Sequence, residues 1–172
     1  LNVFSGEIEP CHIAVAGGHV VGFGRYRARE RVDLAGRYVL PGFIDAHVHI
    51  ESSMTAVPEF VRAVLARGTT TVVADPHEIA NVLGGEGISY MLAEADRQPM
   101  NLYFTLPSCV PATDMETAGA ELSAEALMPF FREKRILALG EMMNFPGVLA
   151  GAPDVLQKIQ AARSHHKPVD GH

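Results

Sequence analysis

The chain has 172 residues, 48% of them hydrophobic and 20% charged, a composition typical of globular proteins and not of disordered or fibrous ones. Its formal net charge is −6 and its Lys and Arg residues form no cluster, so neither nucleic acid nor an anionic membrane surface is an expected partner. No apolar run reaches the roughly 18 residues of a membrane-spanning helix, and no basic stretch leads into an apolar one near the start. We therefore expect a soluble, cytoplasmic protein.

Both ends of the sequence indicate a piece of a longer protein. The chain begins at Leu1 without an initiator Met, in the middle of an expected strand. It stops at His172, directly after another expected strand. We therefore expect further residues on both sides in the native protein.

Residues 1–38 are predicted to form small antiparallel β structure. The stretch is rich in Gly and β-branched residues, and its apolar runs at residues 12–15 and 19–23 flank the pair Gly17-Gly18. A glycine pair between two such runs is typical of a β-hairpin.

From residue 39 onward, apolar runs alternate with segments of helical period. The predicted strands cover residues 39–50, 69–74, 102–106 and 136–140 and the surroundings of Val169. The predicted helices cover residues 56–67, a segment with Ile88, Met91, Leu92 and Ala95 on one face, residues 123–134 after the cap Ser123, and the stretch after Pro153. Pro129 is expected to kink or delay the third helix. This alternation indicates an α/β fold with a parallel sheet, either a TIM (β/α)8 barrel or an open doubly wound sheet.

Polar residues at the ends of the strands favour the barrel. They are His47, His49, Asp75, His77, Cys109, Glu141 and His172. A TIM barrel builds its active site at the C-terminal ends of its strands. A dinucleotide-binding sheet would instead need Gly-x-Gly-x-x-Gly after the first strand, where the sequence has none. About four and a half of the eight βα units of a barrel are present, so we expect a partial barrel.

His47 and His49 are the centre of a predicted metal site. Two residues apart on a strand, their side chains leave the same face with Cα atoms roughly 6.5 Å apart, so both imidazoles can reach one cation. A His-x-His pair alone is a weak signal. It gains weight because Glu141 and His172 stand at the ends of later strands and can join the same site.

These residues carry a resemblance to a known family. The segment PGFIDAHVH at residues 41–49 resembles the first-strand signature of the amidohydrolase superfamily. The continuation is similar to the bacterial adenine deaminases within that superfamily. The similarity lies in four further blocks, ESSM at 51–54, GTTTVVADPHEIANV at 68–82, GEMMN at 140–144 and VDGH at 169–172.

The resemblance implies a fold and a ligand set. Residues 1–38 would be part of a small β-sandwich domain, and residues 39–172 the first half of an amidohydrolase TIM barrel. His47 and His49 would bind one divalent cation, Glu141 would bridge two cations, and His172 would bind the second. Two further ligands, a histidine from the sixth strand and an aspartate from the eighth, would follow His172, so the active site in this segment would be incomplete.

The implied activity is hydrolysis of the small purine adenine to hypoxanthine and ammonia. Histidine and carboxylate ligands suit manganese, ferrous iron and zinc, and we rank manganese and iron ahead of zinc. We also expect the full-length protein to form a homo-oligomer. Two alternatives stay open, namely another amidohydrolase such as a deacetylase or cyclic amidase, and a catalytically inactive fragment.

Asp75, His77 and Glu78 follow the second barrel strand and are further candidates for catalysis. They could orient the purine or help to move protons. They could equally cap the loop after this strand, as Asp commonly does. We expect a substrate role for them beside the bridging Glu141.

Overall fold

The computed structural model describes residues 1–113 and 115–171, so Asp114 and His172 lie outside the described residues. The chain divides into two compact units, Leu1–Pro41 and Gly42–His172. Within the described part of the chain, no helix is long and apolar enough to cross a membrane.

The first unit contains a β-hairpin. Strands β1 (Ile13–Ala16) and β2 (His19–Phe23) pair in antiparallel fashion. Gly17 and Gly18, which join them, have φ angles of 57° and 78°. A two-residue turn with positive φ at both positions fits the twist of a hairpin and favours glycine at both. The predicted antiparallel structure is confirmed, whereas the β-sandwich stays a prediction because the described residues of this unit form only these two strands.

The second unit is built on a parallel sheet of four strands, namely β3 (Phe43–Val48), β4 (Thr69–Ala74), β5 (Asn101–Leu106) and β6 (Ile136–Leu139). Their order in the sheet is β3-β4-β5-β6, the same as in the sequence, and each neighbouring pair is parallel. A barrel has this sequential order, whereas a doubly wound sheet reverses its order at a switch point. The sheet is therefore compatible with part of an amidohydrolase barrel.

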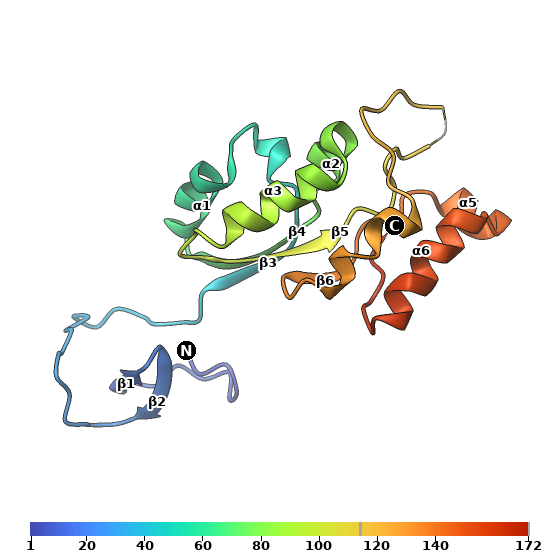
Figure 1. The fold of residues 1–172 in the computed structure, drawn as a ribbon. Coiled ribbons are helices and arrows are strands. Elements are labelled where there is room, and N and C mark those ends of the chain that lie inside the picture. The colour runs from blue at the N-terminus through green and yellow to red at the C-terminus, as the bar shows by residue number, and fades with distance from the viewer. Residues whose placement is uncertain (114, 172) are drawn as a thin grey trace. The chain divides into compact units, whose positions relative to one another are not determined.

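Four described helices of the second unit lie between the parallel strands, and two follow β6. They are α1 (Val57–Leu65), α2 (His77–Leu83), α3 (Gly85–Ala95), α4 (Ala124–Leu127), α5 (Phe145–Ala150) and α6 (Pro153–Ser164), with short 3-10 turns η1 (Glu51–Ser53) and η2 (Phe130–Arg132). Helix α1 packs on β4 and α3, α3 packs on β5, and α6 packs on β6. Figure 1 shows α1, α2 and α3 together on one side of the sheet.

The core is centred on β5. Leu102, Phe104 and Leu106 are fully buried because β4 and β6 flank this strand and α3 packs on it. By contrast, Phe43 and Ile44 of β3 are 59% and 69% exposed. These apolar side chains are poorly covered because β3 lies at the edge of the described sheet.

The structure differs from the prediction in the extent of two elements and in two additional helices. The helix predicted at residues 123–134 ends after Leu127 and gives way to η2, because Pro129 cannot continue an α-helix. Its predicted cap is confirmed, since the Ser123 hydroxyl accepts a hydrogen bond from the backbone N–H of Ala126 at 3.2 Å. In the described chain the expected fifth strand is a single parallel bridge between Val169 and Leu139. Helices α2 and α5 were not predicted.

Candidate metal centre

The predicted site residues gather at one edge of the sheet. His47 lies in β3 and His49 just after it, Asp75 follows β4, and Glu141 follows β6. Because the strands are parallel, their C-terminal ends meet at this edge. His77 is the first residue of α2. His172 lies outside the described residues.

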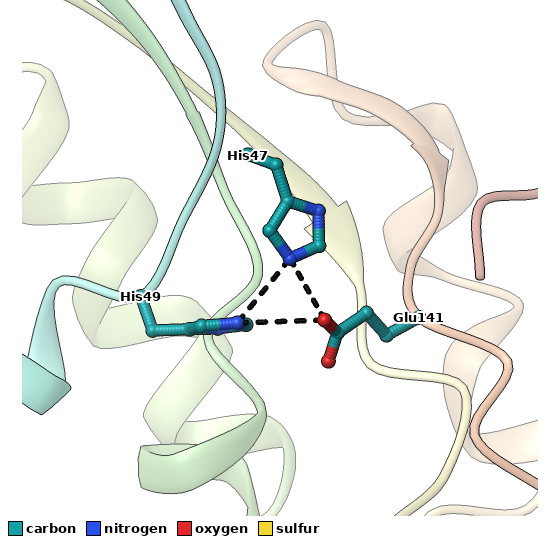
Figure 2. Close-up of side chains that lie close together, drawn as sticks. All are labelled: His47, His49 and Glu141. Atoms are coloured by element: carbon teal, nitrogen blue, oxygen red, sulfur yellow. Dashed lines mark hydrogen bonds and ion pairs between the residues drawn. The ribbon is translucent and has the colours of Figure 1, made fainter. Parts of the chain in front are cut away.

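The side chains of three residues converge as the ligands of one metal ion would, namely His47, His49 and Glu141 (Figure 2). The two Nε2 atoms are 3.3 Å apart, and Oε1 of Glu141 lies 2.8 Å from Nε2 of His47 and 3.6 Å from Nε2 of His49. Ligands at about 2.1 Å from a tetrahedral cation lie roughly 3.4 Å from one another. Two of the three separations are close to this value, and the third, 2.8 Å between Nε2 of His47 and Oε1 of Glu141, is a hydrogen-bond distance.

The other ring nitrogens hold both histidines in the orientation that a metal requires. Nδ1 of His47 lies 3.1 Å from Oδ2 of Asp170, and Nδ1 of His49 lies 2.9 Å from the backbone oxygen of Asp75. Since carboxylate and carbonyl oxygens only accept, each Nδ1 carries a proton, so Nε2 is the nitrogen of each ring that can give its lone pair to a cation. Metal-binding histidines in proteins almost always have such an outer partner.

The electrostatics of the cluster favour a positive charge. Burial lowers the pKa of His47, but the carboxylates of Asp170 and Glu141 outweigh burial and bring that pKa above its ordinary value. The carboxylate of Asp75 is likewise the main reason that the pKa of His77 is raised. A cation at these rings replaces protons that the same carboxylates otherwise hold there, so metal binding should release protons.

The three further catalytic candidates occupy different surroundings. Asp75 is only 2% exposed, and its Oδ2 lies 3.6 Å from Nδ1 of His77. The same Nδ1 lies 3.7 Å from Oε2 of Glu141. Glu78 turns to η1, where its Oε1 accepts a hydrogen bond from the hydroxyl of Ser52 at 2.5 Å. Asp75 and His77 therefore adjoin the candidate centre, and Glu78 is held beside it.

A pocket of about 320 Å³ opens next to this cluster. It is lined by His77, Glu78, Asn81, Cys109, Ala112, Glu116 and Met143. Its volume lies at the small end of the range for ligand sites, and its wall mixes apolar with polar side chains as such sites do. The pocket brings Cys109, predicted at a strand end, into the same neighbourhood.

Asp170 is a site residue for which the sequence indicated no role. The signal was present, because Asp170 follows Val169 just as His47 and Glu141 stand at the ends of their strands. Its backbone is fixed by two hydrogen bonds, from its N–H to the oxygen of Leu139 and from the N–H of Met142 to its oxygen. Its side chain thereby reaches His47.

Comparison with known proteins identifies the class. The sequence profile described as the Amidohydrolase family matches residues 38–172, and the chain belongs to this family. The family is metal-dependent, in agreement with the candidate ligands found here.

Several full-length relatives carry one and the same description. The chain is 53% identical to an adenine deaminase of Desulfatibacillum aliphaticivorans, 53% identical to one of Clostridium acetobutylicum and 54% identical to one of Nitratidesulfovibrio vulgaris. Each match covers 100% of this chain and 30% of the relative. The chain thus spans about a third of the length of the curated relatives it matches.

Proposed function

We propose that the full-length protein, meaning this sequence at the length of its relatives, hydrolyses adenine to hypoxanthine and ammonia. Water supplies the oxygen of the product, and the exocyclic amino group leaves as ammonia. The main support is sequence identity: about half of the residues, along the entire chain, are identical to those of adenine deaminases. The candidate metal ligands at the edge of the sheet support the proposal, because metal-activated water is a nucleophile suited to this hydrolysis.

The ligand assignments belong to the proposal. His47 and His49 hold one divalent cation, Glu141 bridges to a second, and His172 binds that second cation. The donor set of imidazoles and a carboxylate suits manganese or ferrous iron, with zinc as the alternative. Two such cations supply a water nucleophile at neutral pH and stabilise the charge that develops during attack. The near-tetrahedral spacing at His47, His49 and Glu141 supports the first part of this assignment.

The pocket beside the centre is proposed to hold the purine. His77 and Glu78 lie in its wall, where they can orient the ring and carry protons to and from its nitrogens. The raised pKa of His77 supports a proton-carrying side chain there. Asp75 borders the pocket through His77, and it does not cap the loop, because neither of its carboxylate oxygens has a hydrogen bond within the described chain.

The remaining partners are proposed from charge. A net charge of −6 without a basic cluster supports a small-molecule enzyme and gives no surface suited to nucleic acid or anionic lipid. The cytoplasmic location and the homo-oligomeric state stand as predictions for the full-length protein.

A substrate screen tests the activity. The full-length protein, reconstituted with Mn²⁺ or Fe²⁺, should release ammonia from adenine and should leave N-acetyl sugars and cyclic amides unchanged. The measurement is steady-state turnover on each compound with an ammonia-coupled assay. Hydrolysis of an N-acetyl sugar or a cyclic amide without turnover of adenine would place the protein elsewhere in the amidohydrolase family.

Asp170→Asn should weaken cation binding by about 10–100-fold, the usual cost of losing an outer partner of a metal-binding histidine. The amide can donate to Nδ1 of His47, which favours the tautomer with the proton on Nε2, the nitrogen that faces Glu141. Competition with a chromophoric chelator measures the affinity. Asp45→Asn is the matched control, because Asp45 accepts a hydrogen bond from the backbone of His47 and not from its ring. Equal affinities of the two variants would rule out the orienting role.

A further inference from the structure

Asp75 is a buried carboxylate without hydrogen-bond donors. It is 2% exposed, and within the described residues neither Oδ1 nor Oδ2 has a hydrogen-bond partner. Nδ1 of His77 and Oγ1 of Thr105 are buried and lack partners in the same way. Buried polar groups in native proteins nearly always have partners, and a carboxylate removed from water without one is strongly unfavourable. These groups therefore point to a ligand that they share.

Asp75, His77 and Glu141 are spaced as ligands of one cation. Nδ1 of His77 lies 3.6 Å from Oδ2 of Asp75 and 3.7 Å from Oε2 of Glu141, and one ligand atom from each residue lies within 4.8 Å of the others. Ligands about 2.1 Å from a cation lie roughly 3.0–3.4 Å apart in octahedral or tetrahedral geometry. The two distances from His77 exceed this range by a few tenths of an ångström, and the third separation, between the carboxylates of Asp75 and Glu141, is at most 4.8 Å.

The carboxylate of Glu141 is shared between the two groups of residues. Its Oε1 faces His47 and His49, with the shorter distance of 2.8 Å to His47. Its Oε2 is the atom measured to His77. Each carboxylate oxygen of Glu141 thus faces a different group of residues, as expected of a carboxylate that bridges two cations.

An ion pair between His77 and Asp75 is the simpler explanation of their proximity. At 3.6 Å, however, the two atoms are beyond hydrogen-bond distance, and Oδ1 of Asp75 would still lie buried without a partner. A divalent cation can engage both oxygens of the carboxylate and Nδ1 of His77 at once.

We infer that Asp75 and His77, together with Oε2 of Glu141 and in addition to the proposed ligand His172, bind the second divalent cation of the proposed centre. The inference rests on the proposed function and makes it more specific, because it turns two residues considered for substrate contact into ligands. Orientation of the purine and proton transfer at the pocket then fall to Glu78.

Counting cations tests the inference. The metal-free full-length protein is titrated with Mn²⁺, bound Mn²⁺ is counted by elemental analysis after gel filtration, and affinities come from chelator competition. Asp75→Asn and His77→Gln should each bind one cation fewer than the unchanged protein, or bind it at least about 100-fold more weakly, since changes in outer partners alone cost roughly 10–100-fold. Glu78→Gln is the matched control for cation number, because Glu78 bonds to Ser52.

The outcomes separate the inference from the proposed activity. An Asp75→Asn protein that binds the full number of cations at unchanged affinity overturns the inference. If that variant does not fold, as judged by circular dichroism, His77→Gln decides, since its side chain is 21% exposed and tolerates replacement. If the unchanged protein releases no ammonia from adenine while the variants still lose one cation, the proposed adenine hydrolysis is refuted. The assignment of Asp75 and His77 as cation ligands is then retained.

Discussion

Glu141→Gln should remove most of the metal from the full-length protein and lower adenine turnover by about 1,000-fold or more. Gln has nearly the same size and shape but no charge, and only one of its two terminal atoms can bind a cation. If two cations approach Glu141 as proposed, their mutual repulsion is then no longer offset by its negative charge. A loss of roughly 4 kcal/mol of transition-state stabilisation, a modest share of what metal ions supply, corresponds to this drop in rate.

The number of metal ions bound per chain decides whether Glu141 bridges two cations. Elemental analysis is run beside adenine kinetics on Glu141→Gln and on Glu125→Gln, a control with the same change of charge on an exposed side chain of α4. The control should keep its metal and its activity. Two tightly held cations in Glu141→Gln, with a loss of activity confined to substrate binding, would refute the bridging role.

The location of the candidate centre could be predicted from strand ends alone. The sequence placed His47, His49 and Glu141 after apolar runs of a parallel sheet, and the described structure brings them within 4.8 Å of one another. The inference works because parallel strands all end at the same edge, so sequence separation is no obstacle to convergence. Their role as metal ligands does not follow from position alone and requires measured cation binding.

Short helices account for much of what the sequence did not reveal. Helix α2 starts after Pro76 without any side-chain cap and ends at Gly84 after seven residues, too few for a visible helical period. Helix α5 did have signals, because Asn144 caps it, Pro stands at its first turn and Gly151 ends it with φ 70°. At six residues it still offers no apolar face to recognise.

Contacts that depend on the position of the backbone also could not be predicted from the sequence. The bond from His49 to the backbone oxygen of Asp75 depends on the register of β3 against β4, which has shifts at two places. The close approach of Gly140 to neighbouring strands likewise depends on how β4, β5 and β6 end in space. Periodicity fixes which residues share a face and leaves such registers open.

Gly140→Ala should destabilise the protein by about 1–3 kcal/mol, the usual cost of an added methyl group in a packed interior, and should weaken cation binding. A Cβ at Gly140 would lie 2.6 Å from Oδ2 of Asp75 and 2.9 Å from its Cγ, and it would also meet Oγ1 of Thr105. Because Asp75 and Thr105 are buried, relief requires displacing the carboxylate that is proposed to bind metal. Thermal unfolding and chelator competition measure the two effects. Thr105→Ala removes one of the clashing atoms, so the double variant should recover part of the stability lost in Gly140→Ala. Unchanged melting temperature and cation affinity in Gly140→Ala would show that the strand ends can separate freely, and that the spacing around Asp75 does not determine metal binding.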